Sequence, residues 1–71
     1  DYDAGAMLAV REELSKVEAI LKQHPHVSIA NYNSQNQIVL AGPTVEIGKV
    51  RQALQDQGYS AILLPVSAAF H

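Results

Sequence analysis

His71 carries the side chain best suited to proton transfer, because an imidazole titrates near neutral pH. In the sequence it follows an apolar run, Ile62–Leu64, and then a segment of mostly small residues, Ser67–Phe70. This order predicts a strand whose end leads to an imidazole. We therefore take His71 as a candidate general base.

Two other groupings of chemically active residues are weaker candidates. His24 and His26 flank a proline and could form a pair of metal ligands, but no third ligand is near, so we expect a polar helix exit there and no metal site. The segment Gly58–Ile62 matches only the first half of the G-x-S-x-G nucleophile elbow, and it precedes a predicted strand instead of a helix. We therefore expect Ser60 not to be a nucleophile.

A polar connection joins two strand-like runs, residues 27–31 and 37–41. The runs alternate larger apolar residues with small or polar ones, which is typical of half-buried strands. Asn31 and Asn33 lie in the connection, where a side-chain amide can hydrogen-bond the local backbone. An amide here, in particular that of Asn33, can also face a ligand. The two runs predict a β-hairpin around which the rest of the chain packs.

Size and composition limit the class of protein. The 71 residues are enough for one small domain, and 48% apolar content argues against disorder. The absence of cysteine excludes disulfides and thiolate metal sites and favours a cytoplasmic protein. A net charge of −2 without charge clusters predicts no nucleic-acid partner, and no apolar run is long enough to cross a membrane. The sequence begins at Asp1 and ends soon after an apolar strand, which we interpret as a fragment of a longer polypeptide.

Hydrophobic periodicity predicts two helices and two more strands around the hairpin. The helices are expected at 11–23 and between Thr44 and Gly58, and the strands at 6–10 and 61–66. Thr44 is the predicted N-cap of the second helix and Gly58 its C-terminal glycine. Gly48 lies inside that helix, where close packing on the sheet would explain it. Pro65 indicates that the last strand lies at a sheet edge.

The order β-α-β-β-α-β predicts an α+β fold, the ferredoxin-like βαββαβ sandwich. In this fold a four-stranded antiparallel sheet carries both helices on one face. The last strand is apolar at three successive positions, 62–64, so the face without helices is expected to need cover from another surface.

Several functions of this fold require residues that this sequence lacks. RNA recognition needs aromatic rings on the central strands, where aliphatic residues such as Leu8 and Leu40 are expected. A copper chaperone needs a pair of thiols. An acylphosphatase-like enzyme needs an arginine in a phosphate-binding loop, whereas Arg11 and Arg51 are predicted to be solvated helix residues.

Three segments are fairly specific when taken together: GAMLAV at 5–10, IANYNS with QIVLAG within 29–42, and LPVSAAFH at 64–71. They resemble the acyltransferase domains of polyketide and fatty acid synthases and the free-standing malonyl-CoA:acyl carrier protein transacylases. The resemblance implies that residues 1–71 form the small ferredoxin-like subdomain of such a domain. The large α/β-hydrolase-like subdomain would be supplied by other parts of the polypeptide, with the active site between the two.

The resemblance also implies a mechanism and its residues. In the family, a serine of the large subdomain attacks an acyl-CoA thioester, a histidine is its base, and the phosphopantetheine thiol of an acyl carrier protein then takes the acyl group. This gives His71 the role of base and implies no bound cofactor beyond these substrates. The family's selectivity motif tends to read His-Ala-Phe-His for malonyl transfer. Phe70 therefore implies malonyl selectivity, although it is equally explained by packing, and Ala68 departs from the motif.

A second hypothesis comes from a different class of protein. The chain could be a non-catalytic ferredoxin-like ligand-binding or docking module that self-associates through its open sheet face. A G-x-S-x-G segment upstream in the parent sequence would support the enzyme, and a complete unrelated domain there would support the module. The isolated chain, which lacks a nucleophile, is predicted to be inactive under either hypothesis.

Overall fold

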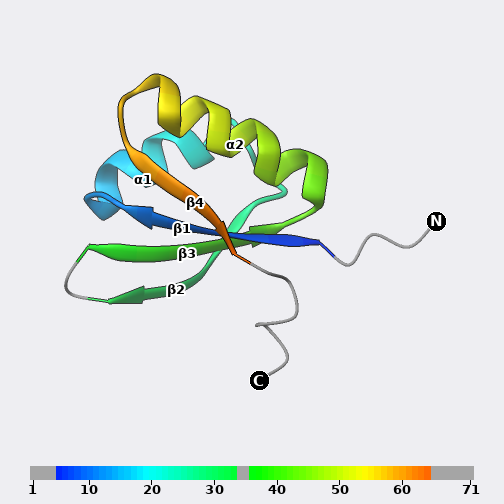
Figure 1. Cartoon of the computed structure of the whole chain (residues 1–71), viewed down its shortest axis with the longest axis horizontal. Coiled ribbons are helices and arrows are strands. Elements are labelled where there is room, and N and C mark those ends of the chain that lie inside the picture. The colour runs from blue at the N-terminus through cyan, green and yellow to red at the C-terminus, as the bar shows by residue number, and fades with distance from the viewer. Residues whose placement is uncertain (1–4, 34–35, 65–71) are drawn as a thin grey trace.

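The computed structural model describes residues 5–33 and 36–64. Its elements are, in order, β1 (Ala6–Arg11), α1 (Leu14–Leu21), β2 (Ser28–Asn33), β3 (Gln37–Gly42), α2 (Thr44–Asp56) and β4 (Ser60–Leu64). The strands form one antiparallel sheet in the order β2-β3-β1-β4, and both helices cover the same face of it (Figure 1). The predicted α+β ferredoxin-like sandwich is confirmed, as is the edge position of the last strand.

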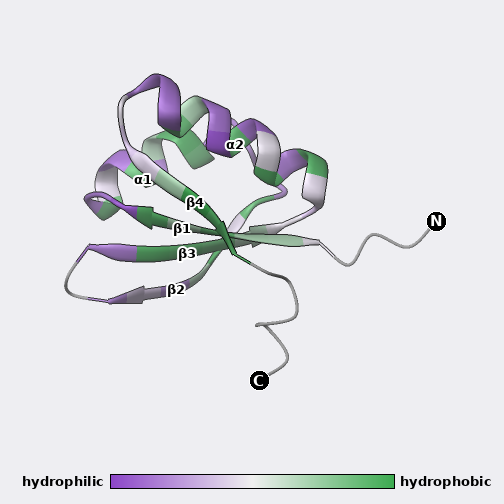
Figure 2. Cartoon of the chain, in the orientation of Figure 1, coloured by the Kyte–Doolittle hydropathy of each residue, from purple (hydrophilic) through white to green (hydrophobic). Residues whose placement is uncertain are grey.

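The core lies between the two helices and the central strands β1 and β3. Leu8 on β1 and Leu40 on β3 are fully buried, and so are Ile47 and Leu54 on α2. Each such side chain contributes about 1.5–3 kcal/mol through its removal from water. Figure 2 shows the apolar residues of the helices and central strands gathered toward this layer.

The hairpin has a smaller structural role than the sequence indicated. Its first strand, β2, lies at the edge of the sheet, and all six of its residues are exposed. A β-bulge between Ile29 and Asn31 interrupts its pairing with β3. The elements therefore pack around β1 and β3, because only these strands have neighbours on both sides.

The first helix begins later than predicted. Strand β1 continues to Arg11, which pairs with Gln37 on β3 and Ser60 on β4, and the helix starts at Leu14 after the N-cap residue Glu13. A central strand satisfies its backbone on two sides, and this outweighs the local preference of Arg11 for a helix. The expectation that Arg11 is a helix residue is wrong.

The second helix differs from prediction at two positions. Pro43 occupies its N-cap, and Thr44 is already its first residue. The N-terminal position suits proline, whose missing N–H would have no partner within the helix there. Gly48 is exposed, and nothing lies within 4 Å of where its Cβ would be, so close packing does not explain it. Gly58 follows the helix with a φ of 82°, as predicted for a C-terminal glycine.

The polar connection of the hairpin is shorter than the predicted 31–36. Strand β2 runs to Asn33, and Asn36, with a φ of 60°, directly precedes β3. Such a left-handed conformation is tolerated by asparagine better than by most residues. At the other end of β3, a Cβ on Gly42 would lie 2.8 Å from the carbonyl oxygen of His26. Only glycine fits between β3 and the turn that leads into β2.

Candidate functional site

The face of the sheet opposite the helices is formed by three rows of side chains. Residues paired across neighbouring strands point to the same side of a sheet. The pairing therefore aligns the following rows, each written from β2 to β4: Asn33, Gln37, Arg11 and Ser60; Asn31, Val39, Ala9 and Ile62; Ser28, Ala41, Met7 and Leu64. We call this surface the open face, because no helix covers it in Figure 1.

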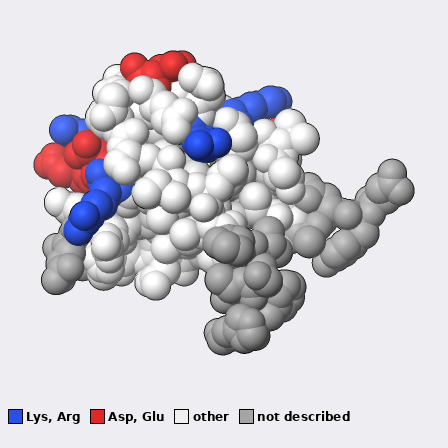
Figure 3. Space-filling model, in the orientation of Figure 1, with Lys and Arg blue, Asp and Glu red and all other residues white. Residues whose placement is uncertain are grey.

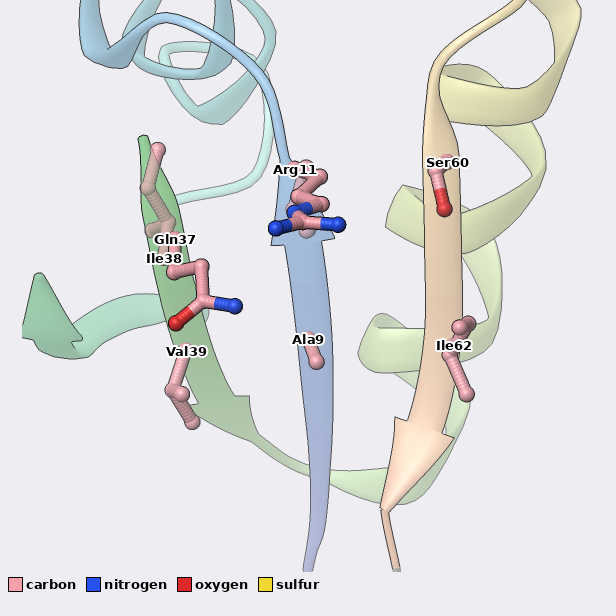
Figure 4. Close-up of a pocket in the computed structure, with 8 residues that line it drawn as sticks. Ala9, Arg11, Gln37, Ile38, Val39, Ser60 and Ile62 are labelled. Carbon is pink, nitrogen blue, oxygen red and sulfur yellow. The ribbon is translucent and has the colours of Figure 1, made fainter. Parts of the chain in front are cut away.

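The open face is apolar over most of its central part and polar at one end. Ile62 is 60% exposed, and its neighbours Ala9 and Val39 are half-buried. The first row, which contains Arg11, is polar on all four strands, and we call it the polar row. A hollow of about 320 Å³ lies where the two kinds of surface meet (Figure 4). Its size is in the range of small ligand pockets.

Two side chains of the polar row, those of Asn33 and Gln37, are hydrogen-bonded to each other. The Nδ2 of Asn33 donates a hydrogen bond of 3.0 Å to Oε1 of Gln37. Figure 4 shows Arg11 between Gln37 and Ser60, with its guanidinium over the hollow. No residue among 5–33 and 36–64 forms an ion pair with Arg11.

The ion pairs of the described residues belong to the helical side of the molecule. Lys16 lies 3.7 Å from Glu12, and Lys49 of α2 lies 3.6 Å from Glu46. Both signs of charge are interspersed on the surface in Figure 3, and no patch of one sign is visible there. On the face shown there, the charges of both signs therefore lie close together.

Of the four predicted site residues, the structure describes Asn33. His71, Phe70 and Ala68 lie outside the described residues. Asn33 lies in the polar row at the end of β2, but its side chain is exposed and hydrogen-bonded to Gln37. Its predicted contact with a substrate remains a prediction.

The two histidines considered as possible metal ligands are also among the described residues. His24 is half-buried and His26 is exposed, and they lie in the turn between α1 and β2. No group of three possible metal ligands occurs within the described parts of the chain. Neither helix there is long and apolar enough to cross a membrane.

Arg11 is a residue of the open face that was not predicted from the sequence. Its position follows from the alternation in β1, where Leu8 and Val10 are buried and Met7, Ala9 and Arg11 alternate with them. Extending the strand period by one residue would have placed this arginine on the sheet.

Comparison with known proteins finds relatives of this chain in sequence and in structure. No protein-family model matches it. The non-reducing polyketide synthase SAT8 of Stachybotrys chartarum is 37% identical over 79 aligned positions, which cover 97% of this chain and 3% of the synthase. The solved malonyl CoA-acyl carrier protein transacylase of Clostridium perfringens is 36% identical with a TM-score of 0.80, covering 92% of this chain and 22% of that one.

A further solved structure supports the same relationship. The acyltransferase domain from the second module of the salinomycin polyketide synthase has a TM-score of 0.80 and 26% identity, over 89% of this chain and 15% of that one. The fold and these relatives define a piece of an acyltransferase domain. The chain matches a fragment of the acyltransferase domains of polyketide synthases and of malonyl-CoA:acyl carrier protein transacylases, as the sequence resemblance implied. It spans only 3–4% of the length of the first curated relatives it matches.

Proposed function

We propose that this chain is the small subdomain of a domain that transfers a malonyl-type acyl group from CoA to an acyl carrier protein. The observation that supports it most is the similarity to a malonyl CoA-acyl carrier protein transacylase, which extends over 92% of this chain. The apolar open face supports a second part of the same domain as a partner, because exposed apolar surface of this kind is usually covered. The matching share of the solved acyltransferases, 15–22%, leaves room for that larger part.

In the proposed mechanism, His71 removes the proton from a serine hydroxyl that the larger subdomain supplies. The serine oxygen attacks the thioester carbonyl, and the CoA thiol leaves with the proton that the imidazolium returns. In the second half-reaction His71 takes the proton of the carrier protein's phosphopantetheine thiol. The sulfur then attacks the acyl-serine ester, and the serine oxygen recovers its proton from the imidazolium.

The residues before His71 are proposed to select the acyl group. Phe70 would fill the space that the α-methyl branch of a methylmalonyl group needs. One methyl group is worth roughly 1–3 kcal/mol of discrimination, so replacing Phe70 with serine should lower the preference for malonyl by about tenfold or more. Ala68 would leave that side of the pocket wider than the histidine of the family motif does. Asn33 is proposed to face the same cleft from the end of β2.

Acyl-CoA and a carrier protein are the proposed substrates, and no bound cofactor is needed for either half-reaction. The cytoplasm is the proposed location, because a sequence without cysteine is typical of proteins that do not depend on disulfides. The larger subdomain and the carrier protein are the proposed partners.

The test uses the intact acyltransferase domain that contains this chain. His71→Ala should lower the rate of malonyl transfer from malonyl-CoA to a carrier protein by about 10²–10⁴-fold, the usual contribution of a general base. The matched control is His26→Ala, which removes an exposed imidazole from the turn after α1 and should leave the rate unchanged. Circular dichroism of both variants verifies that they fold alike.

Two results would contradict the proposal. A near-normal rate for His71→Ala would remove this residue from the mechanism. An intact domain without any acyl transfer, combined with a stable dimer of the chain through its open face, would favour the docking module.

A further inference from the structure

The polar row of the open face offers hydrogen-bond donors around Arg11. A guanidinium has five N–H donors and no acceptor. The Oε1 of Gln37 already accepts from Asn33, and Figure 4 shows the amide nitrogen of Gln37 on the side of Arg11. Ser60 adds a hydroxyl from β4 on the other side. An arrangement of this kind favours an anion with several acceptor oxygens.

The described residues supply no such anion to Arg11. The hollow is lined by no carboxylate. Glu12 is the next residue in the chain, but its Oε1 accepts from the backbone N–H of Glu13 and lies 3.7 Å from Lys16. The positive charge of Arg11 is therefore available to a group from outside these residues.

The polar row lies at the far end of the sheet from the strand end that leads toward His71. Because β4 runs antiparallel to β1, Ser60 pairs with Arg11 and Leu64 pairs with Met7. Four residues of strand separate these two rows, which is about 13 Å at the usual rise per residue. A ligand that meets Arg11 and lies along the open face as far as the row of Leu64 must therefore be long and extended.

We propose that Arg11, with Gln37 and Ser60, binds the phosphate of the phosphopantetheine arm, which would lie along the apolar surface of Ala9 and Ile62. The inference rests on the proposed function, because it takes the thioester or thiol end of the arm to react next to His71. Arginine is suited to this ligand, since its planar guanidinium can donate two parallel hydrogen bonds to a phosphate. The same phosphate ester is present in acyl-CoA and in a loaded carrier protein.

The experiment compares substrates with and without the phosphate, using the intact acyltransferase domain. The donors are malonyl-CoA and malonyl-N-acetylcysteamine, and the acceptors are loaded carrier protein and free N-acetylcysteamine. Arg11→Gln should raise KM about tenfold or more for every phosphate-bearing substrate, as expected for a lost hydrogen bond to a charged group. Transfer between the two phosphate-free substrates should be unchanged. Arg11→Lys, which keeps the charge, should recover part of the loss.

Comparing the two phosphate-bearing substrates shows whether the site binds the phosphate of CoA or that of the carrier protein. A rise in KM for malonyl-CoA alone assigns the site to the free thioester, and a rise for the carrier protein alone assigns it to the protein-bound arm. Lys49→Ala is the matched control, since it removes an exposed positive charge from α2 on the other side of the sheet. In the Lys49→Ala variant, KM should not change differently for substrates with and without the phosphate.

Two results would overturn the inference. One is no change in KM for any phosphate-bearing substrate in Arg11→Gln. The other is an equal loss for all substrates, which would show that Arg11 contacts the rest of the domain. Calorimetry with phosphopantetheine and pantetheine separates this inference from the proposed function. A domain that transfers no acyl group but prefers phosphopantetheine, and loses this preference in Arg11→Gln, would contradict only the proposed function.

Discussion

Asn33 and Gln37 face each other at the end of the β2–β3 hairpin, and Nδ2 of Asn33 donates a 3.0 Å hydrogen bond to Oε1 of Gln37. The contact occupies the acceptor of Gln37 and leaves its amide nitrogen toward Arg11 (Figure 4). It thus connects the part of the polar row on the edge strand β2 to the part on the central strand β3. An asparagine predicted to face a ligand is at the same time part of the hairpin's own structure.

This contact predicts a measurable coupling between the two residues. Asn33→Ala and Gln37→Ala should each lower the free energy of unfolding by about 0.5–1.5 kcal/mol, the usual net value of one hydrogen bond. The double variant should lose less than the sum of the two, because the same bond is lost in each single variant. Urea unfolding of the four proteins measures the coupling. Strict additivity would show that the hydrogen bond does not contribute to stability.

Gly48 predicts a stabilising substitution. The residue is exposed in the middle of α2, and a Cβ there would meet nothing within 4 Å. Gly48→Ala should therefore raise the free energy of unfolding by about 1 kcal/mol, the difference in helix propensity between the two residues. The matched control is Gly58→Ala, which should destabilise because Gly58 has a φ of 82°. Thermal unfolding of both variants shows whether each substitution raises or lowers the melting temperature. A lower melting temperature for Gly48→Ala would contradict the prediction.

Ile47 and Val45 lie on the same helix, and we expect their side chains to contribute very differently to stability. Ile47 is fully buried against the sheet, whereas Val45 is 68% exposed on the outer side of α2. Ile47→Ala should cost about 2–5 kcal/mol through lost burial and the cavity left behind, and Val45→Ala should change stability by less than about 0.5 kcal/mol. Denaturant unfolding measures both. Similar losses for the two variants would mean that the helix does not pack as described.

Ile62 and Leu63 predict self-association of the isolated chain. Both are on the edge strand β4. Ile62 is 60% exposed on the open face, and Leu63, which pairs with the buried Leu8, is 47% exposed on the opposite face. We expect the isolated chain to form dimers or larger species at high concentration, since exposed apolar surface drives association. Ile62→Lys should reduce the association, and Val45→Lys on α2 should not. Sedimentation across a concentration series tests this, and a monodisperse monomer of the unmodified chain at all concentrations would count against an uncovered apolar face.

The sequence predicted the element order and the sheet because the period of the apolar residues changes clearly along the chain. Residues 14–21 repeat at helical spacing, and the runs that became β2 and β3 alternate. The location of Gly58 followed from the conformation that a helix end requires. These features depend on the local conformation of the chain, so the types and spacing of nearby residues are enough to predict them.

Features set by pairing between distant segments could not be predicted in this way. Arg11 belongs to β1 because Gln37 and Ser60 pair with it, and neither partner is near it in sequence. The bulge in β2 and the polar row across four strands have the same origin. The candidate site was predicted mainly from a resemblance at the C-terminal end, whereas the described residues add a different group of side chains at the opposite end of the sheet.

Gly42 fixes how closely the end of β3 approaches the turn that leads into β2. A Cβ at this position would lie 2.8 Å from the backbone oxygen of His26 and 3.2 Å from the Cα of Val27, and neither obstacle can move by rotating a side chain. Any larger residue would have to separate the end of β3 from the segment entering β2. Evolutionary change and protein engineering in the 22–27 turn are thus restricted to lengths and sequences that keep this close approach.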